Sequence, residues 1–346
     1  MSDTRIFQEE RVFHGLNALR GVAAIAVLLY HERLELGVPW LSQSGKLSVD
    51  LFFVISGFVI AHSYEQRIPT IGLVGFMRIR LIRFLPLFYL GGFFGLVRLA
   101  LLVATGRTPD ATIASAIAYF LFLPAPPDGS PSRALAPLNG PGWSLLLEIY
   151  VNFGYALLLR ILSTRVLSVI VAAGAAALVW NLFDGNSQND GVGWDGLFMT
   201  SARVIYSFSI GALMYRLRHH IPNIRIGNAI IVLCFILIVS MPDSIVWSCV
   251  VMTFLSPMLV MFAAYGGQDT FLSRYGANAS YCIYALHSPL LMIAIGAANT
   301  VHLSPAIGLA TATICLIAVA PIIDRKFDRP IRKALKRIHL PIGNTA

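Results

Sequence analysis

Charged side chains are scarce in this sequence: Asp, Glu, Lys and Arg together make up 12% of its 346 residues, whereas a soluble domain carries about 25%. The shortage excludes a soluble globular protein, because such a protein needs about twice this charge on its surface. It also excludes a disordered chain, since disorder requires low hydrophobicity together with high charge. Hydrophobic residues make up 57% of the sequence and the mean hydropathy is +0.72. This composition is typical of an integral membrane protein.

Cysteine is also rare, and its placement excludes two further classes of protein. The four cysteines all lie inside apolar runs and show no metal-ligand spacing; they are Cys234, Cys249, Cys282 and Cys315. A secreted disulfide scaffold would have its cysteines in polar loops and at a higher density. We therefore expect reduced thiols in the apolar core and no metal site.

What the sequence does contain is a series of apolar stretches, each about 20 residues long, which is the length of a helix that crosses a bilayer. They predict an all-α polytopic membrane protein with about ten transmembrane helices. These spans are expected at residues 16–36, 47–64, 84–104, 143–162, 166–183, 197–215, 226–242, 244–264, 280–298 and 305–323. A further apolar stretch, 111–123, is short for a span, so we expect an interfacial or re-entrant helix there on the outer side.

The distribution of Lys and Arg predicts the orientation, because the cytoplasmic loops of membrane proteins are enriched in these residues. With both termini cytoplasmic, all but six of the 26 basic residues lie on the inner side; the exceptions are Arg33, Lys46, Arg98, Arg107, Arg133 and Arg203. We expect a cytoplasmic segment at 1–15, a membrane domain at 16–323 and a basic cytoplasmic tail at 324–346. Topology thus explains the net charge of +9, so we expect membrane lipids and no nucleic acid as partners.

The first predicted span contains ionisable residues, and a charged side chain at the centre of a membrane helix costs about 2.5–3.5 kcal/mol on insertion scales. Arg20 and His31 are eleven residues apart, which is close to three helical turns, so both lie on one face of the helix. Their separation along the axis is about 16.5 Å. Either the two side chains extend to the headgroups of opposite leaflets, or they line a polar path.

Two other predicted spans carry carboxylates. Asp50 lies near the outer end of VDLFFVISGF, and Glu148 lies more than one turn beyond Trp143 in GWSLLLEIY. Asp50 alone is explained by a helix cap, and Glu148 alone by an ion pair with an arginine such as Arg203. With His31, however, both fall in the outer half of the predicted membrane. Carboxylates near an imidazole raise its proton affinity, so we expect these three side chains to converge.

Further candidates lie in the third and ninth predicted spans. The run FMRIRLIRFLPLFY places Arg78, Arg80 and Arg83 at the inner leaflet, where guanidinium groups bind either a ligand's phosphates or lipid headgroups. His287 lies roughly mid-span in SYCIYALHSPLL. A lone histidine there either forms a hydrogen bond between helices or takes part in function.

These segments, in this order, resemble the acyltransferase type 3 family of bacterial integral membrane O-acyltransferases. The matching pieces are Arg20 with His31 ten residues further on, VDLFFVISGF, RIRLIRFLPLFY, GWSLLLE, SYCIYALH and a basic tail with DRP. They extend from residue 14 to about residue 332, nearly the whole chain. One departure is Ile149, which stands where the family often has a second acidic residue.

The resemblance implies transfer of an acyl group, most often acetyl, from cytoplasmic acyl-CoA to a hydroxyl of a sugar or polysaccharide outside the bacterial cytoplasmic membrane. It carries the family's catalytic histidine onto His31 and the matching arginine onto Arg20. The span-two and span-four acids correspond to Asp50 and Glu148. Acyl-CoA is the expected donor substrate, and no cofactor is expected to stay bound.

A mechanism follows from this resemblance. Arg20, Arg78, Arg80 and Arg83 would bind the CoA phosphates. His31 would act as general base, polarised by Asp50 or Glu148, or would carry the acyl group covalently. Further candidates, including donors to the oxyanion, are Ser56, Ser144, Trp143 and His287.

The alternative from another class is a proton-coupled transporter or exporter of an anionic or lipid-linked sugar. Such a protein would use the same intramembrane Arg, His and carboxylate groups. Transporters often consist of repeated halves with broken helices at matching positions. The sequence shows no internal repeat, which favours the enzyme.

Overall fold

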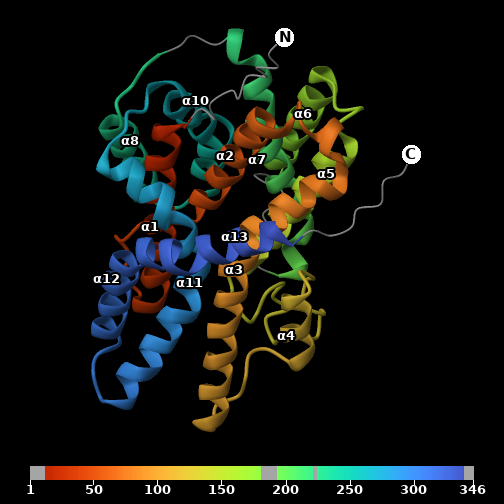
Figure 1. Ribbon diagram of the computed structural model, residues 1–346. Helices are drawn as coiled ribbons and strands as arrows, with labels where there is room; N and C mark the ends of the chain where they lie inside the picture. Colours follow the sequence, from red (N-terminus) through yellow and green to blue (C-terminus); the bar gives the residue numbers. More distant parts are fainter. Residues whose placement is uncertain (1–11, 181–192, 221–223, 339–346) are drawn as a thin grey trace.

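A computed structural model describes residues 12–180, 193–220 and 224–338, and this part of the chain is helical with no β-strand (Figure 1). The helices are α1 (His14–Leu36), α2 (Ser48–Tyr64), α3 (Ile68–Ala104), α4 (Ile113–Phe120), α5 (Gly142–Leu158), α6 (Thr164–Trp180), α7 (Leu197–Leu217), α8 (Asn228–Ser240), α9 (Ile245–Val250), α10 (Ser256–Gly266), α11 (Phe271–Thr300), α12 (Pro305–Ile323) and α13 (Arg329–Arg337). A π-helical turn at Val251–Leu255 joins α9 to α10, and another at Asp324–Asp328 joins α12 to α13.

Every predicted span lies on a helix. Within the described residues, six helical segments are long and apolar enough to cross a membrane, as a helical membrane protein requires; they are Gly45–Tyr64, Ile68–Ala104, Trp194–His220, Ile245–Gly266, Phe271–Thr300 and Pro305–Arg337. The remaining four predicted spans coincide with α1, α5, α6 and α8. The count of ten, the orientation and the domain limits stay predictions. Parts of the predicted terminal segments (1–11 and 339–346) and the end of the fifth span (181–183) lie outside the described residues.

The third helix differs most from the prediction, because α3 begins at Ile68 and not at residue 84. The added part contains three arginines among apolar residues, and arginine is a good helix former that hydropathy alone does not count. Gly72 has a φ of +69°, so a kink separates the first turn from the rest of α3. The short helix expected at 111–123 is present as α4, while its interfacial position stays a prediction.

Glycines bring the central helices into close contact. α1 packs against α11, and α2 packs against α7 (Figure 1). A Cβ at Gly57 of α2 would lie 1.9 Å from the carbonyl oxygen of Phe208, and one at Gly211 of α7 would lie 2.0 Å from that of Val54. Membrane helices associate through such small residues because lipid supplies no hydrophobic force between them.

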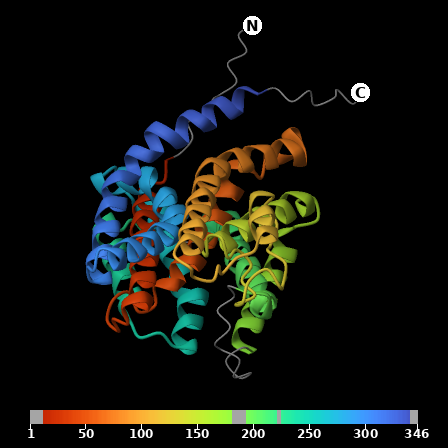
Figure 2. The same ribbon diagram turned by 90° about the horizontal axis from the view of Figure 1, so that it is seen from below.

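The C-terminal helix α13 lies against α3 (Figures 1 and 2). Arg78 of α3 donates hydrogen bonds to the carbonyl oxygens of Lys336, at 3.3 Å, and of Ile338. Asp324 accepts from Arg329 at 2.6 Å and from Arg332 at 3.3 Å. The described part of the basic tail is therefore a helix held against α3.

Gly57→Ala tests the α2–α7 contact. We expect the free energy of unfolding to fall by about 1–3 kcal/mol, because the new methyl group forces two backbones apart. The measurement is thermal unfolding of the detergent-purified protein. The matched control is Gly154→Ala, since a Cβ at Gly154 meets nothing within 4 Å and replacing a helical glycine by alanine is mildly stabilising. Equal stability of the two variants would contradict the packing described.

Candidate active site

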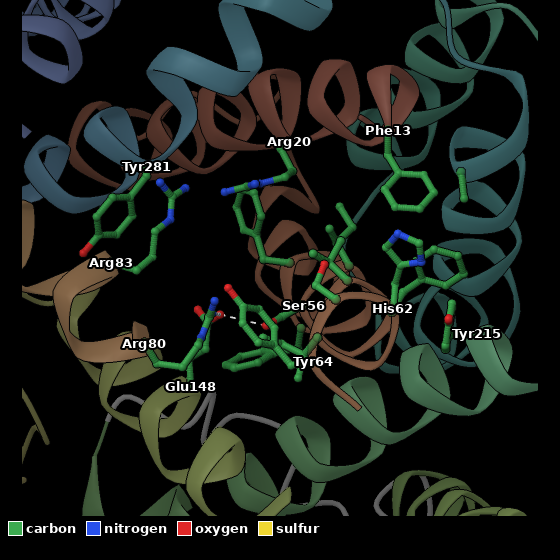
Figure 3. A pocket seen from close by; sticks show the side chains of 18 of the residues that line it. Phe13, Arg20, Ser56, His62, Tyr64, Arg80, Arg83, Glu148, Tyr215 and Tyr281 are labelled. Carbon is green, nitrogen blue, oxygen red and sulfur yellow. Dashed lines mark hydrogen bonds and ion pairs between the residues drawn. The ribbon is translucent and has the colours of Figure 1, made fainter. Parts of the chain in front are cut away.

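One large pocket, of about 1460 Å³, lies among α1, α2, α3, α5, α7, α10 and α11 (Figure 3). Its lining follows α2 along nearly the whole helix, from Val49 to Tyr64, and continues to Arg67. Fifteen helical residues correspond to about 22 Å, so the pocket is long and not merely wide. Apart from α2, most of its polar lining comes from arginine and tyrosine side chains.

The mouth of the pocket lies where the ends of four helices meet. Phe13 precedes α1, Tyr64 ends α2, Tyr215 lies near the end of α7 and Tyr265 lies near the end of α10, and all four residues line the pocket. The predicted topology assigns each of these ends to the cytoplasmic side. All four assignments follow from one predicted orientation, so the side of the membrane on which the mouth lies stays a prediction.

Three arginines and one carboxylate form a cluster inside the pocket (Figure 3). Arg80 lies 3.3 Å from Glu148 Oε1, and the Ser56 hydroxyl donates to the same oxygen at 2.8 Å. Arg20 interacts electrostatically with Arg83, Glu148 and Arg80. Because one carboxylate compensates only one of the three guanidinium groups, the cluster carries net positive charge and suits a multiply charged anion.

The far end of the pocket is closed by Tyr284. Its hydroxyl lies 2.5 Å from Ser144 Oγ, and its ring packs against Phe52 with centroids 5.5 Å apart. Ser144 donates its own proton to the Pro141 carbonyl oxygen at 2.9 Å, so Tyr284 is the donor in the bond to Ser144. Tyr284 lines the pocket, whereas the nearby His287 does not.

Behind Tyr284 lies a pair of histidines. The His287 ring centroid is 5.9 Å from that of Tyr284 and 4.8 Å from that of His31. His31 Nδ1 lies 2.9 Å from the Val27 carbonyl oxygen, and His287 Nδ1 lies 2.8 Å from the Tyr284 carbonyl oxygen. Carbonyl oxygens only accept hydrogen bonds, so each Nδ1 carries a proton and, in the neutral imidazole, each Nε2 is a base. Among the described residues, His287 Nε2 has no hydrogen-bond partner.

The predicted convergence of His31 with two carboxylates is wrong. Asp50 is buried and accepts from Arg203 at 2.7 and 3.3 Å, whereas Glu148 lies in the arginine cluster, paired with Arg80 and not with Arg203. If either carboxylate lay beside the neutral His31 instead, its arginine would stay uncompensated in the low-dielectric interior. The free-energy cost of that unpaired arginine exceeds what the histidine would gain from the carboxylate. The groups that orient His31 are the Val27 carbonyl and His287.

Other predicted residues separate into those inside the pocket and those outside it. Arg20, Arg80, Arg83, Ser56 and Ser144 line the pocket. Arg78 does not, because it is bonded to the C-terminal segment. Trp143 lines a separate, mostly apolar cavity of about 220 Å³ together with Tyr150, Leu146 and Leu197.

Several pocket residues were not predicted from the sequence. Tyr284 lies three residues before His287, and this near-helical spacing was a readable signal that Tyr284 points toward the same site. Phe13 and His62 lie at the ends of predicted spans, and Tyr215 and Arg218 lie at the end of another. A single sequence does not distinguish them from ordinary residues at the end of a helix. Only the packing of α1, α2 and α7 brings these four to one mouth.

Comparisons with known proteins agree with the resemblance noted in the sequence. Residues 13–325 match the acyltransferase domain family. Over 154 residues, 41% of this chain, the sequence is 33% identical to protein 2 in the picA locus of Rhizobium radiobacter, and the match covers 79% of that protein. Over 79 residues, 22% of this chain, it is 42% identical to O-acetyltransferase OatA of Staphylococcus aureus strain NCTC 8325. That match covers 12% of OatA. No solved structure matches the chain significantly.

The family match covers most of the chain, so the chain belongs to the acyltransferase type 3 family and is an acyltransferase. The prediction of an enzyme of this class is confirmed. The matched region contains the arginine cluster, Tyr284 and the two histidines.

A double-mutant cycle tests the ion pair between Arg80 and Glu148. Glu148→Gln and Arg80→Gln should each destabilise the protein, because each leaves an uncompensated partner. The double variant should recover about 1–3 kcal/mol relative to the sum of the two single effects. The measurement is thermal unfolding of the four purified proteins. Strictly additive effects would show that the two side chains do not interact.

Proposed function

We propose that this protein is a membrane O-acyltransferase of the bacterial cytoplasmic membrane. It transfers an acyl group, in the first instance acetyl, from cytoplasmic acyl-CoA to a hydroxyl of a sugar or polysaccharide on the outer side. The observation that carries the proposal is the order of groups from the mouth inward: three arginines and Tyr284 line one pocket, and the pair of His31 and His287 lies next to Tyr284. The similarity to an O-acetyltransferase supports acetyl as the group transferred.

The donor lies along the pocket in this proposal. Arg20, Arg80 and Arg83 bind the CoA pyrophosphate, because guanidinium groups pair with phosphate through charge-assisted hydrogen bonds. Glu148 keeps Arg80 in place, which makes it a positioning residue. His31 is eleven residues beyond Arg20 on α1, about 16.5 Å along the axis. An extended pantetheine arm bridges a distance of this order and brings the thioester to the histidines.

The transfer step needs one base and one acid, and His31 supplies both. His31 Nε2 takes the proton of the acceptor hydroxyl while that oxygen attacks the thioester carbonyl carbon. The C–S bond then breaks, the acyl group stays on the acceptor oxygen, and the imidazolium returns the proton to the CoA sulfur. In a covalent variant of this route, Nε2 itself attacks the carbonyl, the C–S bond breaks and CoA leaves as the thiolate. In a second step the acceptor oxygen attacks the acyl group, the imidazole leaves, and the proton of the acceptor hydroxyl goes to the CoA sulfur.

Three other side chains act on the same centre. The Tyr284 hydroxyl, now bonded to Ser144, donates to the oxyanion once the thioester displaces that bond. His287 packs on His31 and fixes the direction of its ring. Asp50 is a positioning residue that anchors α2 to Arg203 of α7.

His31→Ala should abolish transfer without affecting insertion, because no other group in this account takes the acceptor proton. We would supply radiolabelled acetyl-CoA to inside-out membrane vesicles and follow the label into glycan. His220→Ala is the matched control, since His220 is exposed on a turn after α7; its transfer should equal that of the wild type. Full activity of His31→Ala would overturn both the general-base and the covalent routes.

The same vesicles test the sidedness of the donor. Right-side-out vesicles should give little label, because acetyl-CoA does not cross the membrane. Equal labelling in intact vesicles of both orientations would contradict a cytoplasmic mouth. No label with any acyl-CoA in either orientation would contradict the enzyme and favour the transporter.

Tyr284→Phe should lower kcat about 100-fold while the KM for acetyl-CoA stays within about twofold, because the hydroxyl acts on the oxyanion and not on the bound donor. Steady-state kinetics on purified protein would measure both constants. Ser144→Ala removes the resting partner of Tyr284 and should leave kcat largely intact. A Tyr284→Phe variant that changes KM alone would place Tyr284 in donor binding instead.

A further inference from the structure

The mouth of the pocket is lined by aromatic side chains that the transfer mechanism does not use. Phe13 before α1, His62 of α2 and Tyr215 of α7 come from three helices and lie together at the end of the pocket away from Arg83 and Tyr281 (Figure 3). All three side chains are half-buried, whereas Phe58 behind them is 2% exposed. The exposed parts of the three rings therefore belong to the wall of the pocket.

These rings contact one another edge to face. The Phe13 and His62 rings are 4.9 Å apart at 77°, and the His62 and Tyr215 rings are 5.4 Å apart at 77°. Phe58 meets Tyr215 at 5.7 Å and 88°. In a purely structural aromatic cluster, the rings fill the space between them. Here the steeply inclined rings border a pocket that continues to the arginines. Such walls suit a flat aromatic ligand that stacks on one ring and touches the edges of others.

A cation lies next to this aromatic group. The Arg218 guanidinium lies 4.1 Å from the centroid of the Tyr215 ring, and Arg218 donates to the Tyr215 carbonyl oxygen at 2.8 Å. Arg218 also lines the pocket. A ligand whose flat ring stacks at Tyr215 would thus have a guanidinium within reach of any phosphate close to that ring.

The aromatic group and the arginine cluster are a fixed distance apart. Arg20 lies seven positions after Phe13, which corresponds to about 10 Å along the axis of α1. A nucleotide with an aromatic base at one end and a pyrophosphate at the other spans a distance of this order. CoA is such a molecule, and its ribose carries an additional phosphate near the base.

We propose that Phe13, His62 and Tyr215 bind the adenine base of the donor and that Arg218 binds its ribose phosphate. This inference rests on the proposed function, because it places the two ends of acyl-CoA in one pocket. It adds that the protein selects its donor by the nucleotide end, so that an acyl-phosphopantetheine, which lacks adenosine, is a poor donor.

The direct test uses a probe that contains only the nucleotide end, adenosine 3′,5′-bisphosphate, and purified full-length protein in nanodiscs. Calorimetry should show binding to the wild type and about tenfold weaker binding to Tyr215→Leu, since stacking on an aromatic ring is lost. Tyr215→Phe keeps the ring and should bind like the wild type, which separates loss of stacking from misfolding. Phe271→Leu is the control, because Phe271 is 76% exposed and does not line the pocket.

Arg218→Gln tests the phosphate. The wild type should bind adenosine 3′,5′-bisphosphate about tenfold more tightly than adenosine 5′-phosphate, and the variant should bind both alike. Arg225→Gln removes an exposed arginine after the same helix and should keep the preference. An unchanged preference in Arg218→Gln would overturn the assignment of Arg218.

Transfer measured on the same preparations distinguishes failure of the adenine site from failure of the proposed function. Transfer from acetyl-CoA without any nucleotide binding, or with binding equal in Tyr215→Leu, overturns the adenine site and leaves the proposed function standing. Tyr215-dependent nucleotide binding without transfer from any acyl-CoA supports the adenine site and overturns the proposed function. Displacement of the probe by anionic lipid but not by CoA would assign the mouth to lipid headgroups and overturn the inference.

Discussion

Charge compensation inside an apolar protein is the constraint on which the rest of this structure depends. A guanidinium or carboxylate within a membrane helix is costly unless it is paired. The chain meets this requirement with two ion pairs that each join separate helices: Asp50 of α2 to Arg203 of α7, and Glu148 of α5 to Arg80 of α3. With the glycine contact between α2 and α7, these pairs join four of the helices that line the long pocket, α2 to α7 and α3 to α5.

The pairing also determines what the pocket can bind. Glu148 pairs with Arg80 and accepts a hydrogen bond from Ser56, so the three arginines that line the pocket keep a net positive charge, which suits an anionic ligand. A chain of groups then leads from the mouth through this cluster to Tyr284 and the histidines, whose Nδ1 protons are held by backbone carbonyls. The proposed function thus relies on one arrangement both to bind an anionic donor and to place a base.

The sequence predicted the class of fold well and the grouping of site residues only in part. Apolar length is a local signal, so every predicted span lies on a helix, and Arg20 and His31, eleven residues apart, both lie on α1. Which carboxylate meets which arginine depends on how helices pack, and this is why Glu148 was expected beside His31. Arg78 and Arg80 belong to the same basic run, but Arg78 is bonded to the C-terminal segment and does not line the pocket. The two side chains lie on different faces of α3, and only the position of α13 shows which partner each face meets.

The central claim is that one pocket carries the donor from an inner mouth to His31. The most direct measurement is an electron cryo-microscopy structure of the full-length protein with a thioether analogue of acetyl-CoA, which cannot be cleaved. The account predicts the pyrophosphate between Arg20, Arg80 and Arg83, and the acetyl end past Tyr284, next to His31. An analogue bound outside this pocket, or bound with its acetyl end at the mouth, would contradict it.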